Sequence, residues 1–142
     1  MKDWILAVAL GVTISGVALA DERPYTDGSV WGLAMIRTTD GMGDRYLESL
    51  RKNYKPIMEE AKKQGLVLSY KIISTTTSGP DDWDIILMTE YKNWAALDGL
   101  SEKFEAVSRQ VISKPDEDKL MEQRLQVRRF VGNKSGQEMI LK

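Results

Sequence analysis

Aromatic side chains frame the segment WDIILMTEYKNWAALDGL, in which an apolar run passes directly into a helical pattern. Flat apolar walls with a few polar groups are typical of sites for small organic molecules. Arg37 is an even number of residues from Trp31, which places it on the same face of the strand, and its positive charge would suit an anionic part of such a ligand. These features predict a ligand pocket formed by Trp31, Arg37, Tyr70, Trp83, Tyr91 and Trp94.

The same aromatic residues have a second interpretation. Large aromatic side chains contribute heavily to cores and to subunit contacts, so these five aromatic residues are also what a core or a dimer contact would contain. The sequence leaves both interpretations open. It does not identify a ligand.

Two residue types are missing, and their absence limits the chemistry. The chain has no cysteine, which excludes disulfides, zinc–thiolate sites, iron–sulfur clusters and thiol nucleophiles. It has no histidine, which excludes a Ser-His-Asp triad, histidine metal ligation and a proximal haem ligand. Catalysis would have to come from carboxylates, Lys, Arg, Tyr, hydroxyls, backbone groups or a borrowed cofactor. No catalytic motif is recognisable, so the sequence favours a protein without catalytic machinery and predicts no cofactor.

Three aspartates lie close together in GPDDWD: Asp81, Asp82 and Asp84. Clustered carboxylates can bind calcium, but this cluster lacks the spacing and the final Glu of an EF-hand loop. Aspartate is common in turns because its side chain accepts hydrogen bonds from nearby backbone amides. We therefore expect turn-forming aspartates and no metal site.

The charges are spread along the chain. The formal net charge is -1, and the densest basic stretch is RLQVRR, with Arg124, Arg128 and Arg129. A nucleic-acid binder needs a concentrated basic surface. We interpret the three arginines as the solvated face and C-terminal turns of a helix, and we expect no nucleic-acid partner.

The first twenty residues, MKDWILAVALGVTISGVALA, have the pattern of a secretory signal peptide. A positive start and an apolar run lead to a small-x-small site, which predicts cleavage between Ala20 and Asp21. An uncleaved membrane anchor is the alternative, although the apolar run is slightly short for a span. The mature chain would be exported to the periplasm or the exterior, with no membrane contact after cleavage.

The mature chain reads as an irregular leader, residues 21–29, followed by one domain, residues 30–142. Asp44 to Gln64 shows a helical stripe interrupted by Pro56, which predicts one kinked helix or two shorter ones. Period-two and period-three-to-four patterns predict the remaining elements. These are strands over 29–39, 66–74, 83–91 and 137–142, and helices over 93–112 and 119–131, the last starting near Pro115.

This order, βαββαβ with an extra helix before the last strand, predicts a ferredoxin-like α+β fold: a four-stranded antiparallel sheet with helices on one face. The first and third strands are apolar on both faces, as central strands should be. The helices cover only one of these faces. A second copy of the same sheet would cover the other, so we expect a homodimer.

The strand VWGLAMIRT, the turn DGMGDRYLESL, the hairpin GLVLSYKIIS…WDIILMTEYKNWAAL and the late strand EMILK resemble the dimeric α+β barrel superfamily. The strand-to-helix junction is similar to that of small exported bacterial members with no assigned role. The resemblance implies two ferredoxin-like protomers that pack sheet to sheet. The superfamily includes cofactor-independent monooxygenases, haem-degrading oxygenases, lactone isomerases and stress-responsive proteins, so the fold says little about function.

Three hypotheses follow. The first is an exported homodimeric barrel protein that is non-catalytic and binds a small apolar or aromatic molecule. The second is a cofactor-independent oxygenase or isomerase acting on an aromatic substrate. The third is a module whose only activity is pairing. No catalytic residue of the superfamily can be matched to this chain.

Overall fold

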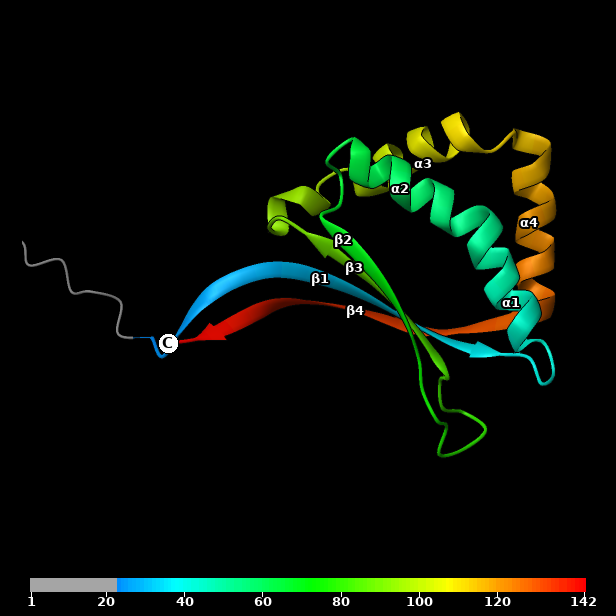
Figure 1. Cartoon of the computed structure of the whole chain (residues 1–142), viewed down its shortest axis with the longest axis horizontal. Coiled ribbons are helices and arrows are strands. Elements are labelled where there is room, and N and C mark those ends of the chain that lie inside the picture. The colour runs from blue at the N-terminus through cyan, green and yellow to red at the C-terminus, as the bar shows by residue number, and fades with distance from the viewer. Residues whose placement is uncertain (1–22) are drawn as a thin grey trace, which may run out of the picture.

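The computed structural model describes residues 23–142 (Figure 1). The predicted signal peptide, its cleavage site and the first leader residues lie outside the described residues. Among the described residues, no helix is long and apolar enough to cross a membrane.

Four antiparallel strands form one sheet in the order β2-β3-β1-β4, and four α-helices connect them. The first and third strands are central and the second and fourth are edges, which confirms the ferredoxin-like prediction. The strands are β1 (Tyr25–Thr38), β2 (Ser69–Ser74), β3 (Ile85–Tyr91) and β4 (Arg128–Leu141). The helices are α1 (Gly43–Ser49), α2 (Lys55–Lys63), α3 (Leu100–Val111) and α4 (Lys114–Val127).

The helices lie on one side of the sheet, with α4 at the end where β4 begins (Figure 1). Alternate residues of the central strands point to this side, which we call the helix face. On it, Val30 and Tyr91 belong to one buried cluster with residues of α2 and α3, and Ile36 and Ile85 belong to a second with Tyr46 of α1. The core therefore lies between the helix face and the helices.

The opposite side of the sheet, which we call the open face, has no helix over it. Its centre is formed by half-buried apolar side chains from β1 and β3: Trp31, Leu33, Met35, Ile86 and Met88. Polar residues stand at its margin, among them Glu90, which accepts a hydrogen bond from Ser69, and Lys71, whose ammonium lies 5.2 Å from the Trp31 ring centroid.

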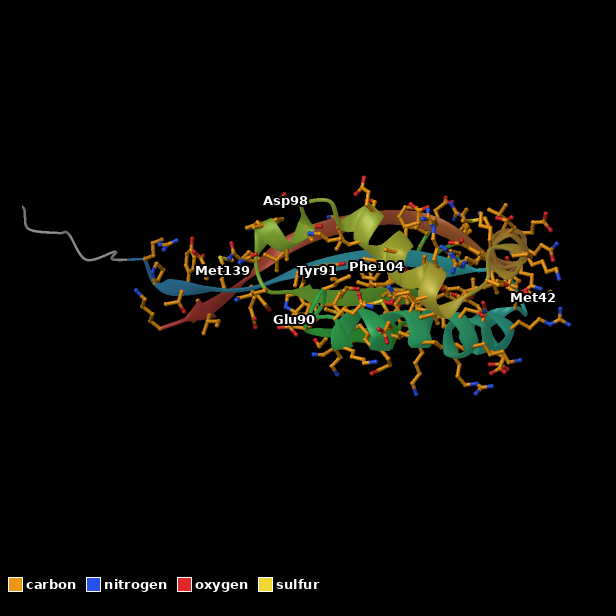
Figure 2. The ribbon with its side chains drawn as sticks, turned by 90° about the horizontal axis from the view of Figure 1, so that it is seen from above. Met42, Glu90, Tyr91, Asp98, Phe104 and Met139 are labelled. Atoms are coloured by element: carbon orange, nitrogen blue, oxygen red, sulfur yellow. The ribbon has the colours of Figure 1, made fainter. Side chains whose placement is uncertain are left out.

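The strands β1 and β4 are longer than the sequence predicted. Tyr25 to Ser29 are strand rather than an irregular leader, and β4 begins at Arg128 rather than near residue 137. Backbone pairing extends from Tyr25 opposite Leu141 to Thr38 opposite Arg128, with two bulges that absorb irregularities in register. This pairing overrides the weak strand propensity of GNKSGQ. Beyond β3 the two strands form an arm, on which Met139 is 63% exposed (Figure 2).

Two predicted helices are interrupted. A π-helical turn, Leu50–Tyr54, separates α1 from α2 immediately before Pro56, and the Lys55 amide bonds to the Leu50 carbonyl there. The wider π-helical turn accommodates Pro56, which has no backbone N–H to donate a hydrogen bond in the following helical turn. The segment predicted as a single helix over 93–112 is a 3-10 turn, Trp94–Leu97, followed by α3, because the chain turns at Gly99 with a left-handed φ of 61°. The helix predicted over 119–131 is α4, which starts at Lys114 and ends at Val127 where β4 begins.

Candidate functional site

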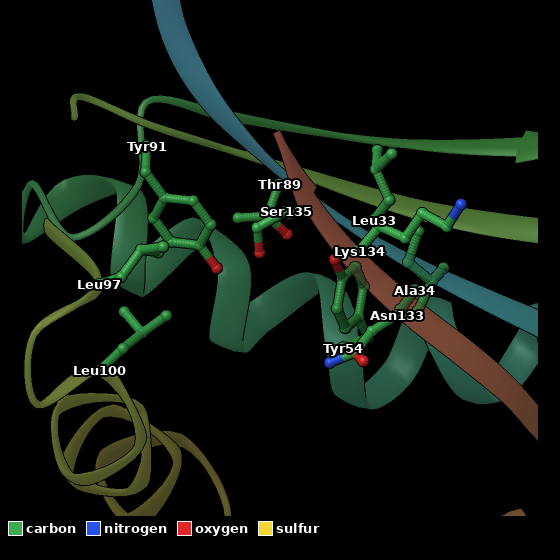
Figure 3. Close-up of a pocket in the computed structure, with 12 residues that line it drawn as sticks. Leu33, Ala34, Tyr54, Thr89, Tyr91, Leu97, Leu100, Asn133, Lys134 and Ser135 are labelled. Atoms are coloured by element: carbon green, nitrogen blue, oxygen red, sulfur yellow. The ribbon is translucent and has the colours of Figure 1, made fainter. Parts of the chain in front are cut away.

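A cleft of about 290 Å³ lies between the helix face and the start of α3 (Figure 3). Its apolar wall combines strand residues with Leu97 and Leu100, which the 3-10 turn and the first turn of α3 bring over the sheet. The helix-face residues of the sheet that line it are Gly32, Ala34, Leu87, Thr89, Tyr91, Asn133 and Ser135.

The absence of a side chain at Gly32 lets the Tyr91 ring lie close to β1. A Cβ at position 32 would stand 3.2 Å from Tyr91 Cε2 and 3.9 Å from its hydroxyl oxygen. Such a distance is tighter than ordinary van der Waals contact, so the ring would have to move. Gly32 thus fixes the depth of the cleft at its tyrosine end.

Two tyrosines supply phenol groups to the cleft. Tyr54 comes from the π-helical turn and Tyr91 from the end of β3, and hydrogen bonding to the Thr89 side chain lowers the pKa of each phenol, although less than burial raises it. The net pKa of both phenols therefore lies above the ordinary value of 10.0. At neutral pH they are hydrogen-bonding hydroxyls and not phenolate bases.

The cleft opens toward the edge strand β4. Ser135 lies opposite Gly32, and Asn133 lies opposite Ala34, so both polar residues share the helix face with the cleft. Both are exposed, since α3 reaches over the central strands and leaves this part of β4 uncovered. The result is an apolar floor with hydroxyl and amide groups on two sides, an arrangement that suits a small molecule with few polar groups.

Of the six predicted pocket residues, only Tyr91 lines this cleft. Trp31 and Arg37 point to the open face because they alternate with Val30 and Ile36, which are buried on the helix face. Arg37 lies toward the far end of the strand, where its guanidinium is 3.9 Å from Asp40.

The other three predicted residues are also separate from the cleft. Tyr70 packs edge-on against Tyr54 with ring centroids 5.8 Å apart and donates a hydrogen bond of 2.7 Å to Glu59. Trp83 is half-buried at the end of the β2–β3 hairpin loop. Trp94 is 47% exposed, with its indole N–H 3.0 Å from Gln137 Oε1. The six residues therefore do not form one pocket.

The sequence interpretation missed Tyr54 and Thr89. Tyr54 is part of a regular helical stripe, so nothing distinguished it from a core residue. Thr89 could have been recognised from the sequence, because it is a hydroxyl residue among the apolar residues of a central strand that face the helices. An inward polar residue in such a strand needs a partner, and here the partners are the two phenols.

The aspartates of the β2–β3 loop stabilise its turn and connect the loop to neighbouring strands. Asp82 accepts hydrogen bonds from the Ser78 amide and hydroxyl at 2.9 and 3.0 Å, which confirms the turn-forming role for this residue. Asp84 accepts from the Thr38 amide at 2.9 Å and ties the hairpin to the end of β1. Residues 23–142 contain no cluster of three acidic side chains placed to hold a metal ion.

No protein-family model matches the sequence, and no curated protein sequence does. Solved structures do match. A dimeric ferredoxin-like protein from an uncultured marine organism aligns with a TM-score of 0.52 at 10% identity, over 82% of this chain and 98% of that protein. HapK from Hahella chejuensis aligns with a TM-score of 0.50 at 10% identity, over 77% of this chain and 91% of HapK. A NIPSNAP family protein from Agrobacterium tumefaciens aligns with a TM-score of 0.50 at 10% identity, over 81% of this chain and 90% of that protein. At such identities the likeness concerns the fold alone. The chain has the ferredoxin-like protomer fold found in these proteins, as its resemblance to the dimeric α+β barrel superfamily implied.

Proposed function

We propose that this chain is an exported protein that pairs through its open face as a homodimer and binds a small apolar or aromatic molecule in the cleft walled by Tyr54 and Tyr91. The observation that carries the binding proposal is the cleft itself, with its apolar floor and the hydroxyls of Tyr54, Tyr91 and Thr89. Export rests on the first twenty residues, whose pattern is that of a cleaved signal peptide.

The open face supports pairing. Its apolar centre has the residue types of a core, yet no helix of residues 23–142 covers it. Contiguous apolar surface of this kind marks an interaction site in monomeric proteins. A second copy related by a two-fold axis presents a surface of the same shape and chemistry, and the similar protein from the marine organism is itself dimeric.

The binding proposal is tested with 2-naphthol, a neutral aromatic probe, by isothermal titration. Gly32→Ala should weaken binding about tenfold, because the new methyl displaces the Tyr91 ring from its place against β1. Tyr91→Phe should weaken it about three- to tenfold by removing one hydroxyl. The matched control is Gly79→Ala, since a Cβ at position 79 meets nothing within 4 Å.

Equal binding by all three variants would contradict the proposed position of the ligand. Absence of binding across a panel of neutral aromatic and aliphatic probes would contradict the binding function. The cleft would then serve packing only, and the chain would be a pairing module.

A second candidate, a cofactor-independent oxygenase or isomerase, is favoured by one observation. Two phenols meet around one threonine hydroxyl inside the cleft, where they could donate protons to a bound substrate. Under this candidate, Tyr54→Phe and Tyr91→Phe abolish turnover of an activated aromatic substrate while circular dichroism stays unchanged. Retained turnover in both variants would exclude these tyrosines as the proton donors.

A further inference from the structure

Two arginines face a second cavity that the cleft does not include. This cavity, about 210 Å³ in volume, lies where α1, the π-helical turn and the α4–β4 junction meet. It is lined by Tyr46, Ser49, Leu50, Asn53, Tyr54, Leu87, Arg124 and Arg128. The sequence interpretation placed Arg124 and Arg128 on a solvated helix face. Arg124 does lie in the last turn of α4, but the solvated position was wrong: Arg124 and Arg128, the first residue of β4, are both half-buried and line this cavity.

The positive charge of this cavity is not neutralised by an ion pair. Among residues 23–142, no carboxylate oxygen lies within 4.0 Å of either guanidinium. By contrast, Arg37 of β1, Arg109 of α3 and Arg129 of β4 each form an ion pair with a carboxylate. Glu117 and Asp84 act on the cavity's groups only from a greater distance. Burial, and then the neighbouring Arg128 cation, lowers the pKa of Arg124 below its ordinary value.

Arg128 is held in place but not satisfied. Its guanidinium carbon stands 5.7 Å from the ring centroid of Tyr46, which is 2% exposed and anchored in the second core cluster. Its Nε is buried and has no hydrogen-bond partner. A buried, unpaired donor on a charged group is costly, and such groups in folded proteins call for a partner.

Neutral donors complete the site. Asn53 Nδ2 donates a hydrogen bond of 3.4 Å to Ser49 Oγ. Because the serine oxygen is the acceptor in this contact, the serine hydroxyl proton stays available for a ligand. Two guanidinium groups, one hydroxyl and one carboxamide form a donor-rich set around a small cavity. Planar guanidinium groups suit the oxygens of carboxylate and phosphate, to which they donate in pairs.

The cavity and the cleft share two lining residues, Tyr54 and Leu87. Tyr54 and Leu87 therefore form a wall common to the cleft and to the space that the two arginines line. A ligand that reached past this wall would place an apolar body in one space and a charged end in the other.

We propose that Arg124 and Arg128, with Ser49 and Asn53, form a binding site for an anionic oxygen group, a carboxylate or a phosphate, carried by the apolar ligand of the cleft. The ligand class narrows to small apolar acids or phosphate esters. This inference rests on the proposed function for the apolar part of the ligand, whereas the anion site itself stands on the arginine geometry.

The first test compares two probes with the same ring, 2-naphthoate and 2-naphthol, by isothermal titration near pH 7. The wild-type protein should bind the acid at least about tenfold more tightly, since charge-assisted hydrogen bonds are stronger than neutral ones. Arg124→Gln and Arg128→Gln should each abolish this advantage. Arg129→Gln is the control. That arginine is the next residue along the chain, it is exposed, and its guanidinium lies 3.6 Å from Asp81, outside the cavity.

The second test needs no variant, so it holds even if Arg128→Gln does not fold. The Nε–H signal of Arg128 is followed by nitrogen-15 NMR during titration with acetate and with inorganic phosphate. Its shift should change with at least one of them, and the stronger response names the preferred group. The Arg129 signal should stay in place.

The outcomes separate the two proposals. Equal affinity for acid and alcohol, with an unmoved Arg128 signal, overturns the anion site and leaves the cleft proposal standing. A moved signal without any naphthol or naphthoate binding supports the anion site and contradicts the cleft proposal. An unmoved signal together with no binding overturns both.

Discussion

The two faces of the sheet are made of similar residues but differ in what lies over them. On the helix face, Ile36 is 1% exposed and Ile85 is 4% exposed, both within the core. Their chain neighbours on the open face, Met35 and Ile86, are only half-buried. Residue type therefore predicts that both faces avoid water, while the helices account for only one of them. This difference is the basis for the proposal that a second copy covers the open face.

The largest contrast is expected from placing a carboxylate on each face of the same strand. Ile36→Asp buries an unpaired charge in the core and should prevent folding, because such burial costs several kcal/mol against a typical stability of about 5–15 kcal/mol. Met35→Asp should leave the protomer folded and dissociate the dimer, since the new carboxylate stays solvated in a monomer. Circular dichroism and light scattering after gel filtration measure the two effects. An unfolded Met35→Asp protein, or one that remains dimeric, would contradict the proposed difference between the two faces.

A smaller contrast uses the same residue type on both faces of β3. Ile85→Ala should lower the free energy of unfolding by about 2–5 kcal/mol, as expected for a cavity in a packed core. Ile86→Ala should lower the free energy of unfolding of the protomer by less than about half of that amount, and its main effect should be to weaken pairing. Denaturant unfolding at several protein concentrations separates these effects, because only the pairing contribution depends on concentration. Equal losses at all concentrations would mean that the open face is packed within one chain.

The smallest effect concerns the polar margin of the open face. The hydrogen bond from Ser69 lowers the pKa of Glu90, whereas the helix face has no buried charged residue among those described. A lowered pKa means that the ionised carboxylate stabilises the fold at pH values above the ordinary 4.5, and that this stabilisation is lost as the pH falls below it. Ser69→Ala should therefore move the pKa of Glu90 upward in an NMR titration. An unchanged value would show that the serine hydrogen bond is unimportant.

Much of the fold was predictable because hydrophobic periodicity reflects which face of each element is buried. The doubly apolar pattern of SVWGLAMIRTT correctly predicted a central strand. The extent of β4 was not predictable, since GNKSGQ has few strand-forming residues and is extended only by its backbone pairing with β1. The break at Gly99 was missed because a glycine within a helical pattern is often tolerated.

The candidate site was harder to predict than the fold. Aromatic residues were visible in the sequence, but which of them share a cavity depends on strand register and on the path of the helices. Alternation separates Trp31 from Tyr91, and the π-helical turn brings Tyr54 over Thr89. The inward turn of Arg128 follows from the early end of α4, for which the sequence carries no clear stop signal.

The most direct test of the central claim is the mass of the native protein, purified from a cell that exports it and measured by native mass spectrometry at micromolar concentration. Pairing through the open face predicts twice the mass of the mature chain, with any additional mass belonging to a retained ligand. A single-chain mass under these conditions would contradict pairing through the open face, and that apolar surface would then need a different partner.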